Sequence, residues 1–593
     1  MIIVTFADFC AKRGILHPLV KRVVSGFALG GFGLIFLFAV WQNGPYAGTP
    51  QWNGFSFSSV MLGIIVASVT LAGLLRHHGN PKILLTLSIT AVAGLALLPL
   101  LQMMPGWNNE FTLEEILAPS AGRFPGFDYI AQYETLLGLP LAWLAALLPG
   151  WFALHSTTIA FAWVILLQVL TIALAVAVAV WVAPRRIRWI MPLIVVPVIY
   201  LVDAVGLRYF ADLPFRFILP TVLLAAIALI GTRRAGNMDR WWISLTLGAI
   251  GGLAAFNNLD FGVPAMLSGL LAVVALRPRW LKSTRAGALY LAGAVSAPLL
   301  YILIQFLLGR SFQPSYLIFF AEAFAVKGIS NVDMPVVGIH TGFVMLGIIG
   351  LVIGILGARN LRGRNAILHQ ALIYQSAWLL LSLAYYSGRS VVPNLVSGSA
   401  LQAAVIFALL FASGFGTVQL LIRRGVALWR SAEWITAILT VVSLALPLSA
   451  WSFFPSLQGS STGTLSALKP TMVSTSFLLP DPQKALAAIP DKSQLIGILS
   501  VSGSYWDMRL RIPNVSLFLH PVYIRYERGS DLQCAYIRTL PGRQLLTTRE
   551  SLLVLEASPV CRDTLDFATT TALTHGISAD LVTTAEWVSV DRR

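Results

Sequence analysis

Long apolar runs separated by short basic segments recur along the chain, and they constrain its fold more than any other feature. The chain has 593 residues, of which 57% are hydrophobic and only 11% charged. A mean hydropathy of +0.78 leaves too little charge for a water-soluble surface. The sequence therefore predicts a polytopic α-helical membrane protein with about thirteen spans. The runs lie near residues 23–42, 57–75, 83–102, 157–182, 190–203, 216–231, 242–256, 262–276, 287–308, 337–357, 371–387, 400–423 and 434–452.

Basic residues predict how the spans are oriented. The clusters of Lys and Arg fall on the cytoplasmic side only if the apolar segment LLGLPLAWLAALLPGWF, residues 136–152, does not cross the membrane. Pro140 and Pro149 bracket this segment, so we expect a re-entrant or interfacial helix. The result is a multi-pass protein of the cytoplasmic membrane with its N-terminus inside and its C-terminus outside. The lysines and arginines that give the net charge of +16 then serve to orient the spans in the membrane. No nucleic-acid partner is therefore expected.

The composition changes near residue 453. The chain from there alternates polar and apolar residues between turn residues, which is typical of strands. We expect a transmembrane domain over 1–452 and a small extracytoplasmic α/β domain over 453–593, in which residues 549–576 form a strand, a loop and a helix. Cys534 and Cys561 both lie in this outer part, where a disulfide would be stable. Two unpaired buried cysteines are the alternative.

Carboxylates gather in the outer loop 103–156. Glu114 and Glu115 are adjacent, as is common in the first turn of a helix, so a solvated or helix-capping role explains them. Glu110 lies just beyond a span, and Asp128 lies among prolines and glycines. Carboxylates at membrane depth are usually retained for chemistry or transport. Glu110 and Asp128 are therefore the candidate functional acids, with simple solvation as the alternative.

The loop and the span pattern together resemble the GT-C superfamily of integral-membrane glycosyltransferases. The shared features are an odd number of spans, a cytoplasmic N-terminus, an external C-terminal domain, and a first large outer loop. That loop reads acid, helical stretch, glycine, Pro-x-x-Asp and an apolar LLGLPL element, here from Glu110 through Gly122 and Pro125 to Asp128. Two features depart from the superfamily: the loop follows the third span and not the first, and Glu110 lacks the usual Asp-Glu pair.

The resemblance implies an enzyme that transfers a sugar from a polyprenyl-phosphate donor to a cell-envelope glycan or lipid outside the membrane, with membrane lipids around it. Polyprenyl phosphate is a stable leaving group, so one carboxylate, Glu110 or Asp128, suffices as the base, and the reaction inverts the anomeric carbon. An arabinosyltransferase or a mannosyltransferase is plausible by general similarity, but no residue identifies the sugar.

Further residues are candidates for binding the substrate. Outer-side basic residues are few: Arg123, Arg208, Arg216, Arg310, Lys327 and Arg389. Of these, Arg389 in AYYSGRSVVPNL is the preferred phosphate ligand, and an arginine that reaches the interface beside tyrosines is the alternative. Asn258 and Asp260 form an outer turn that would suit sugar hydroxyls, or simply cap a helix. The remaining candidates are Arg123, Gln132 and Tyr133.

Metal and nucleotide chemistry receive little support. No spacing of His, Cys and carboxylates resembles a metal site, although Glu110 and Asp128 could hold the Mg or Mn that some GT-C enzymes use. There is no glycine-rich phosphate loop. Two other functions compete with the transferase: a flippase or secondary transporter of polyprenyl-linked glycans, and an envelope glycan polymerase or ligase that uses outer-loop arginines.

Overall fold

A computed structural model describes most of the chain beyond residue 113. The described residues are 114–131, 136–185, 187–188, 191–192, 194–195, 199, 213–233, 241–275, 280–311, 339–360, 364–388, 392–424, 486, 489, 491–499, 507–508, 511–517, 527–556, 558–576 and 585–593. The expected spans near 23–42, 57–75, 83–102 and 434–452 lie outside them.

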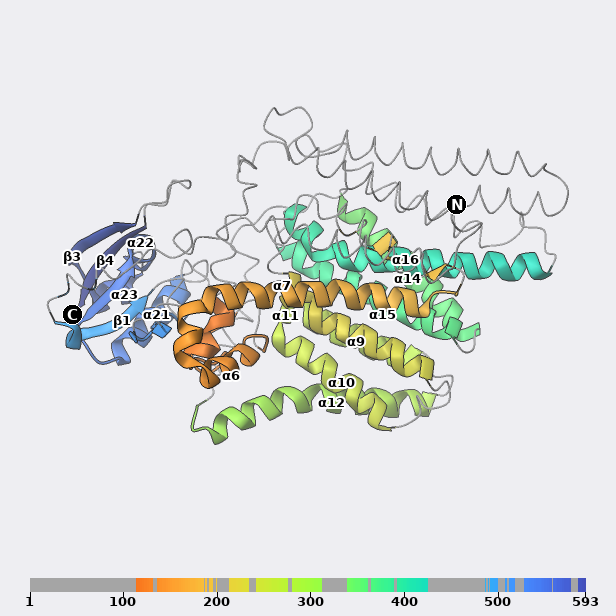
Figure 1. Ribbon diagram of the computed structural model, residues 1–593, viewed down its shortest axis with the longest axis horizontal. Helices are drawn as coiled ribbons and strands as arrows, with labels where there is room; N and C mark the ends of the chain where they lie inside the picture. Colours follow the sequence, from red (N-terminus) through yellow and green to blue (C-terminus); the bar gives the residue numbers. More distant parts are fainter. Residues whose placement is uncertain are drawn as a thin grey trace, which may run out of the picture.

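The described part is mostly helical (Figure 1). Four helices contain a segment long and apolar enough to cross a membrane: Thr158–Val182, Ser283–Leu307, His340–Gly357 and Ala366–Tyr386. Shorter apolar helices accompany them, so the structure is compatible with a membrane protein. The bounds are α6 Leu139–Leu147, α7 Pro149–Val182, α9 Leu213–Arg233, α10 Trp241–Asn257, α11 Leu259–Ala275, α12 Trp280–Leu307, α14 Ile339–Asn360, α15 Arg364–Gly388 and α16 Val392–Arg424.

Helix α15 is the centre of the helical part, packed against α9, α11, α14 and α16. Two of its aromatic residues are fully buried and also bond to neighbouring helices. Trp378 donates its indole N–H to the carbonyl oxygen of Phe261 at 3.0 Å, and Tyr374 donates its hydroxyl to that of Pro220 at 2.8 Å. These bonds thus connect α15 to α11 and to α9 inside the apolar core.

Helices α10 and α12 pack through small residues. A Cβ atom at Gly248 or Gly252 would overlap the backbone of Tyr290 or Ala294, and one at Gly293 would overlap the carbonyl oxygen of Leu245. Backbone-to-backbone packing of this kind is typical of helices in membranes, where small residues allow close approach. The spacing of α10 and α12 therefore depends on these glycines.

The segment 136–152 differs from the expected single helix. It contains α6, a break at Leu148, and the first turn of the 34-residue helix α7, which begins at Pro149. Pro149 thus interrupts the apolar segment, as predicted, and also starts α7, because proline suits the first helical position, where its missing N–H has no helical partner. At about 1.5 Å per residue, α7 is about 51 Å long, well beyond the apolar thickness of a bilayer.

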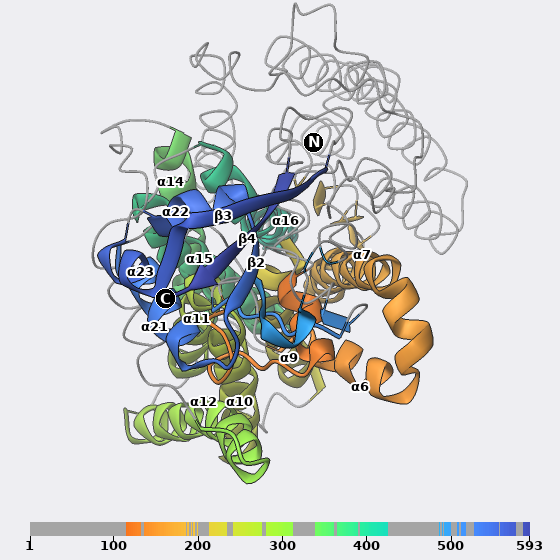
Figure 2. The same ribbon diagram turned by 90° about the vertical axis from the view of Figure 1, so that its left-hand side faces the viewer.

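The C-terminal residues form a four-stranded mixed sheet with the order β1-β2-β4-β3. Strands β1 and β2 are parallel, and β4 is antiparallel to both β2 and β3. The sheet lies at one end of the helical part, beside α6 and the start of α7 (Figures 1 and 2). The bounds are β1 Leu495–Leu499, α21 Glu527–Thr539, β2 Gln544–Thr548, α22 Arg549–Glu556, α23 Pro559–Thr564, β3 Leu565–Gly576 and β4 Ala585–Arg592.

The prediction for residues 549–576 was wrong in its order of elements. The first part is helical, because Leu552 and Leu555 lie three residues apart and are buried together on one face of α22. Ser558 then caps α23, accepting the N–H of Cys561 at 3.2 Å. The threonine-rich remainder is strand β3, where β-branched residues are favoured.

We predict that Gly252→Ala destabilises the protein, whereas Gly414→Ala does not. The first substitution forces the backbones of α10 and α12 apart, which should cost about 1–3 kcal/mol. The second adds the same methyl group to helix α16 at a position where no atom of the described residues lies within 4 Å. Thermal unfolding in detergent, followed by scanning fluorimetry, measures both, and equal midpoints would contradict the packing described here.

Candidate functional site

The site is built on the part of the acidic loop between Glu114 and Ala131. A short 3-10 helix, η1 Ala118–Ala121, ends at Gly122, whose φ of 81° is left-handed and suits glycine. Gly126 has a similar φ of 80° and reverses the chain again. Asp128 closes this turn, because its Oδ2 accepts the backbone N–H of Phe124 at 2.8 Å. The glycine and Pro-x-x-Asp pattern thus produces a compact turn that presents Asp128.

Arg310, just beyond α12, pairs with Asp128. Its guanidinium donates to Asp128 Oδ2 and, at 2.9 Å, to the carbonyl oxygen of Gly122. It also lies over the ring of Phe124, 4.3 Å from the centroid, which adds a cation–π contact. The side chains of Asp128 and Arg310 remain 34% and 28% exposed. Within the described residues, both hydrogen bonds of the Asp128 carboxylate are made by Oδ2, and none is made by Oδ1.

Arg123 joins the turn to the C-terminal residues. Its guanidinium donates to the carbonyl oxygen of Asp128 at 3.1 Å and to that of Ser516. A backbone bond from Ile130 N–H to the carbonyl oxygen of Leu517, 2.9 Å long, runs alongside. Segment 511–517 in turn pairs with β1, since Val515 N–H donates to Ile498 at 2.9 Å. Arg123, expected to bind substrate, therefore connects the acidic turn to the sheet.

Glu114 and Glu115 are buried, 2% and 0% exposed, in a helical turn before η1. Glu114 accepts the side-chain N–H of Asn514 at 2.8 Å. The alternative that these acids are solvated was therefore wrong, whereas their position in a helical turn agrees with the other alternative. Asn514, which contacts Glu114 from the C-terminal segment, lies 400 positions away in the sequence.

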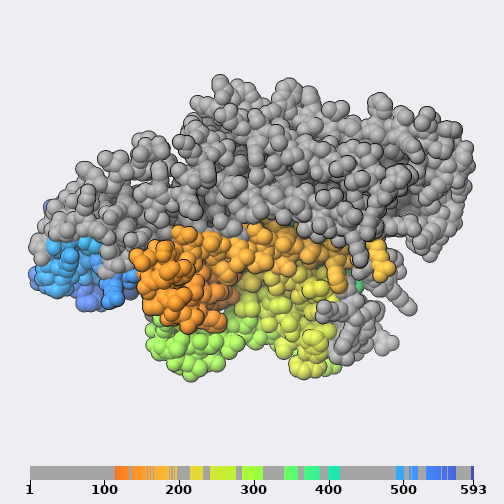
Figure 3. Space-filling model, viewed as in Figure 1, coloured from red at the N-terminus to blue at the C-terminus, as the bar shows by residue number. Residues whose placement is uncertain are grey.

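Two hollows flank η1, and both are bordered by Ser120 and Ala145. The first, of about 370 Å³, lies toward α6 and is lined by Pro119, Ser120, Gly122, Phe124, Leu139, Ala142, Trp143, Ala145 and Ala146. The second, of about 440 Å³, lies toward the C-terminal segment and is lined by Ser120, Ala121, Ala145, Pro149, Phe152, Ala153, Asp507, Met508, Arg511 and Pro513. Figure 3 shows the two chain regions bordering each other, the loop and α6 in orange and the C-terminal residues in blue.

Asp507 is a half-buried carboxyl group in the second hollow. Burial raises its pKa, while the backbone N–H of Asn514 and the positive charge of Arg123 lower it to a smaller extent. The N–H of Asn514 donates to Asp507 Oδ2 at 3.2 Å. Nothing in the local sequence WDMRLRIPN marks this residue, because its significance arises from the contact with the loop.

The turn between α10 and α11 has a structural explanation. Asn258 Oδ1 accepts the N–H of Phe261 at 2.9 Å and caps α11, the alternative we had left open, and Asp260 lies in the first turn of that helix. Asn257 donates to the carbonyl oxygen of Phe215 at 3.0 Å and accepts the N–H of Leu136 at 3.0 Å. This side chain therefore holds the far end of the acidic loop against α9.

Next to Asp260 lies Arg216, only 2% exposed on α9, which donates to the hydroxyl of Tyr385 at 3.2 Å. Its guanidinium also stacks over the rings of Phe261 and Tyr385 at 5.2 and 5.1 Å. Sequence reasoning counted Arg216 and Arg310 among the outer basic residues but preferred Arg389. The aromatic neighbours of Arg216 come from other helices, so no local sequence pattern marks this arginine.

Several predicted site residues lie outside the described part of the chain: Glu110, Gln132, Tyr133 and Arg389. Among the described residues, no group of three His, Cys, Asp or Glu side chains could hold a metal ion.

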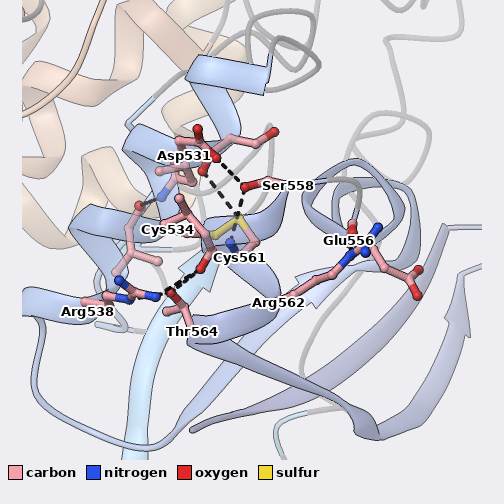
Figure 4. The surroundings of a disulfide bond; sticks show 12 residues. Asp531, Cys534, Arg538, Glu556, Ser558, Cys561, Arg562 and Thr564 are labelled. Carbon is pink, nitrogen blue, oxygen red and sulfur yellow. Dashed lines mark hydrogen bonds between the residues drawn. A yellow bond between two sulfur atoms is a disulfide. The ribbon is translucent and has the colours of Figure 1, made fainter.

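The structure contains a disulfide between Cys534 of α21 and Cys561 of α23 (Figure 4). Both residues are fully buried. Around them, Ser558 donates to Asp531, and Arg538 donates to Thr564 Oγ1 at 2.6 Å. Next to the disulfide, Gln533 binds both Val515 and Leu517 through its side chain, at 2.8 and 2.7 Å. The cross-linked helices therefore also hold the segment that Arg123 contacts.

No protein-family model matches the chain, and a search of curated proteins finds no similar sequence. The functional interpretation therefore depends on the site itself.

We predict that Arg123→Lys loosens the acidic turn from the C-terminal segment. One nitrogen of Arg123, Nη2, donates to both carbonyl oxygens, and the shorter lysine side chain would not carry its ammonium group to the same position. Lost hydrogen bonds to a charged group cost about 1.5–3 kcal/mol. Amide hydrogen exchange at Ile130 should accelerate and the unfolding midpoint should fall. The control is Arg562→Lys, on an exposed arginine of α23 that bonds to Glu556. If Ile130 exchanges equally slowly in both variants, Arg123 does not secure the turn.

Asp507→Asn should stabilise the protein at neutral pH. Because burial raises the pKa of Asp507, its ionised form is the unfavourable one in the folded state, and this cost is fully present above the folded pKa. Asparagine removes the charge and can still accept the N–H of Asn514. The gain in unfolding midpoint over the wild type should therefore shrink as the pH falls through the raised pKa of the wild-type carboxyl group, which then becomes protonated in the folded state. A gain that grows on acidification would contradict this assignment.

Proposed function

We propose that the protein is a GT-C-type membrane glycosyltransferase with about thirteen spans. It transfers a sugar from a polyprenyl-phosphate donor to a cell-envelope glycan or lipid at the outer face of the cytoplasmic membrane. The observation that carries the proposal is the pair of Asp128 and Arg310. It combines a partly exposed carboxylate, whose Oδ1 makes no hydrogen bond within the described residues, with a partly exposed guanidinium. An acid and a cation of this kind are what an inverting transfer from a lipid phosphate requires.

The pair supports a division of tasks. Asp128 Oδ1 would take the proton of the acceptor hydroxyl as that oxygen attacks the anomeric carbon, and the bond to the phosphate oxygen breaks on the opposite face. Arg310 uses two of its five N–H groups on Asp128 and Gly122, so it keeps donors for the departing phosphate. Arg389 would serve as a second phosphate ligand. Glu110 is the alternative base, and Asp128 would then orient Arg310.

The first hollow supports a lipid-linked donor. Its lining is mostly apolar and includes Phe124, which lies under the Arg310 guanidinium, and Trp143, which is 77% exposed. On α6 and the start of α7, large apolar side chains are exposed at Leu147, Trp151 and Leu154. Exposed tryptophans and leucines are typical of the membrane interface. A prenyl chain could thus stay in the outer leaflet while its phosphate reaches Arg310.

A transporter of polyprenyl-linked glycans is the second candidate. The buried arginine on α9, Arg216, with Asp260 close to it, favours this function, because ionisable groups inside apolar helices often mark a transport path. The exposed acid and arginine at the loop favour the transferase.

The test is release of polyprenyl phosphate in proteoliposomes from a panel of polyprenyl-phosphate sugars with added membrane glycan acceptors. Asp128→Asn keeps an acceptor for Phe124 N–H but removes the base, so turnover should fall by about 10²-fold or more. Arg310→Lys should also slow turnover. Asp566→Asn, at a carboxylate 3.9 Å from Arg593 on the sheet, is the matched control and should be unaffected.

Loss of turnover in Glu110→Gln with normal turnover in Asp128→Asn would assign the base to Glu110. A folded wild type that turns over no donor, but moves polyprenyl-linked glycan across the bilayer, would replace the transferase with the transporter.

A further inference from the structure

The second hollow lies between two parts of the chain that are far apart in sequence. One wall comes from the start of α7, with Pro149, Phe152 and Ala153, and the other from the C-terminal turn between Asp507 and Pro513. Its volume of about 440 Å³ falls within the range of small-molecule sites. It is also adjacent to the acidic turn, since η1 separates it from the first hollow and Ser120 borders both.

Asp507 is held in a fixed position in this hollow. Its backbone carbonyl oxygen accepts Arg511 N–H at 2.8 Å, and its Oδ2 accepts Asn514 N–H at 3.2 Å. Asn514 is itself anchored to Glu114 of the acidic loop. No described residue donates to Asp507 Oδ1. Within the described residues, Asp507 Oδ1 is therefore an acceptor available to a ligand in the hollow.

Other polar groups of the hollow complement the carboxylate. Ser120 Oγ is buried and has no hydrogen-bond partner within the described part of the chain. Arg511 is exposed at the hollow's edge and supplies donors. The remaining lining consists of Phe152, Met508, alanines and prolines. A carboxylate acceptor, a hydroxyl, a guanidinium donor and apolar surface together fit a neutral sugar, which has many hydroxyl groups and apolar C–H faces.

We propose that this hollow is a binding site for a neutral sugar unit, with Asp507 Oδ1 and Ser120 Oγ bonded to its hydroxyl groups. The interpretation of this hollow as the place where the acceptor glycan is held rests on the proposed transferase function. Asp507 lies close enough to Arg123 to feel its charge, and Arg123 binds the Asp128 backbone. A sugar bound there would therefore be near the proposed base, on the opposite side of η1 from the hollow for the lipid donor.

Binding is measured without turnover, by saturation-transfer NMR on the full-length protein in nanodiscs. The probes are methyl glycosides of neutral hexoses and pentoses, and empty nanodiscs correct for lipid binding. The wild type should give a signal with at least one probe. Asp507→Asn, which should remain folded, should weaken binding by about tenfold or more, as expected for one lost hydrogen bond to a charged group.

A second pair of variants tests the location of the bound sugar. Ala153→Leu fills the second hollow and should abolish the signal, whereas Ala146→Leu makes the same change in the first hollow and should preserve it.

The outcomes separate this site from the proposed function. If no probe binds the wild type, or if Asp507→Asn and Ala153→Leu bind as well as the wild type, the sugar site is wrong even where donor turnover is normal. If sugar binding depends on Asp507 but the protein turns over no donor, the sugar site is supported and the transferase function is wrong.

Discussion

The arrangement of the candidate site depends on two arginines whose hydrogen bonds hold the short turn between Gly122 and Asp128. Arg123 and Arg310 both donate to backbone carbonyl oxygens of the acidic loop, at Asp128 and Gly122, and Arg310 also pairs with the Asp128 side chain. The loop buries the side chains of Ile116, Leu117, Phe127, Tyr129 and Ile130. Charged hydrogen bonds to its carbonyl oxygens, each stronger than a neutral one, add to the order that this packing supplies. Asp128 is presented in one geometry as a result.

The two arginines also connect the turn to different parts of the molecule. Arg310 follows the end of α12 and so connects the turn to the apolar helices. Arg123 and Ile130 connect it to segment 511–517 beside β1. The Cys534–Cys561 disulfide lies one residue from Gln533, which binds that same segment. The C-terminal sheet is therefore physically part of the candidate site. A change in the sheet can reach Asp128 through a continuous series of hydrogen bonds.

This construction gives the two faces of η1 different chemistry. On the α6 side, the lining is apolar and close to exposed tryptophans and the Arg310 guanidinium, which suits a lipid carrying a phosphate. On the other side, Asp507 and Arg511 add polar groups, which suits a hydroxylated partner. A transferase needs two such neighbouring sites, because it must bring an apolar carrier and a polar acceptor together without mixing them. The proposed functions of the two hollows are thus consistent with one reaction.

Local composition in the sequence was enough to predict apolar helices, a C-terminal part with strands, and a loop in which glycines and Pro-x-x-Asp turn the chain at Asp128. These features follow from hydropathy and backbone preference, which act over a few residues. The partners of Asp128 and Glu114, by contrast, are 182 and 400 residues away, and Asp507 meets the loop only in the folded chain. The wrong order of elements in 549–576 has a local cause, because Leu552 and Leu555 have helical spacing and the threonine-rich remainder favours a strand. Tertiary contact alone determined which charges meet, because pairing over such distances has no period or spacing that a single sequence can show.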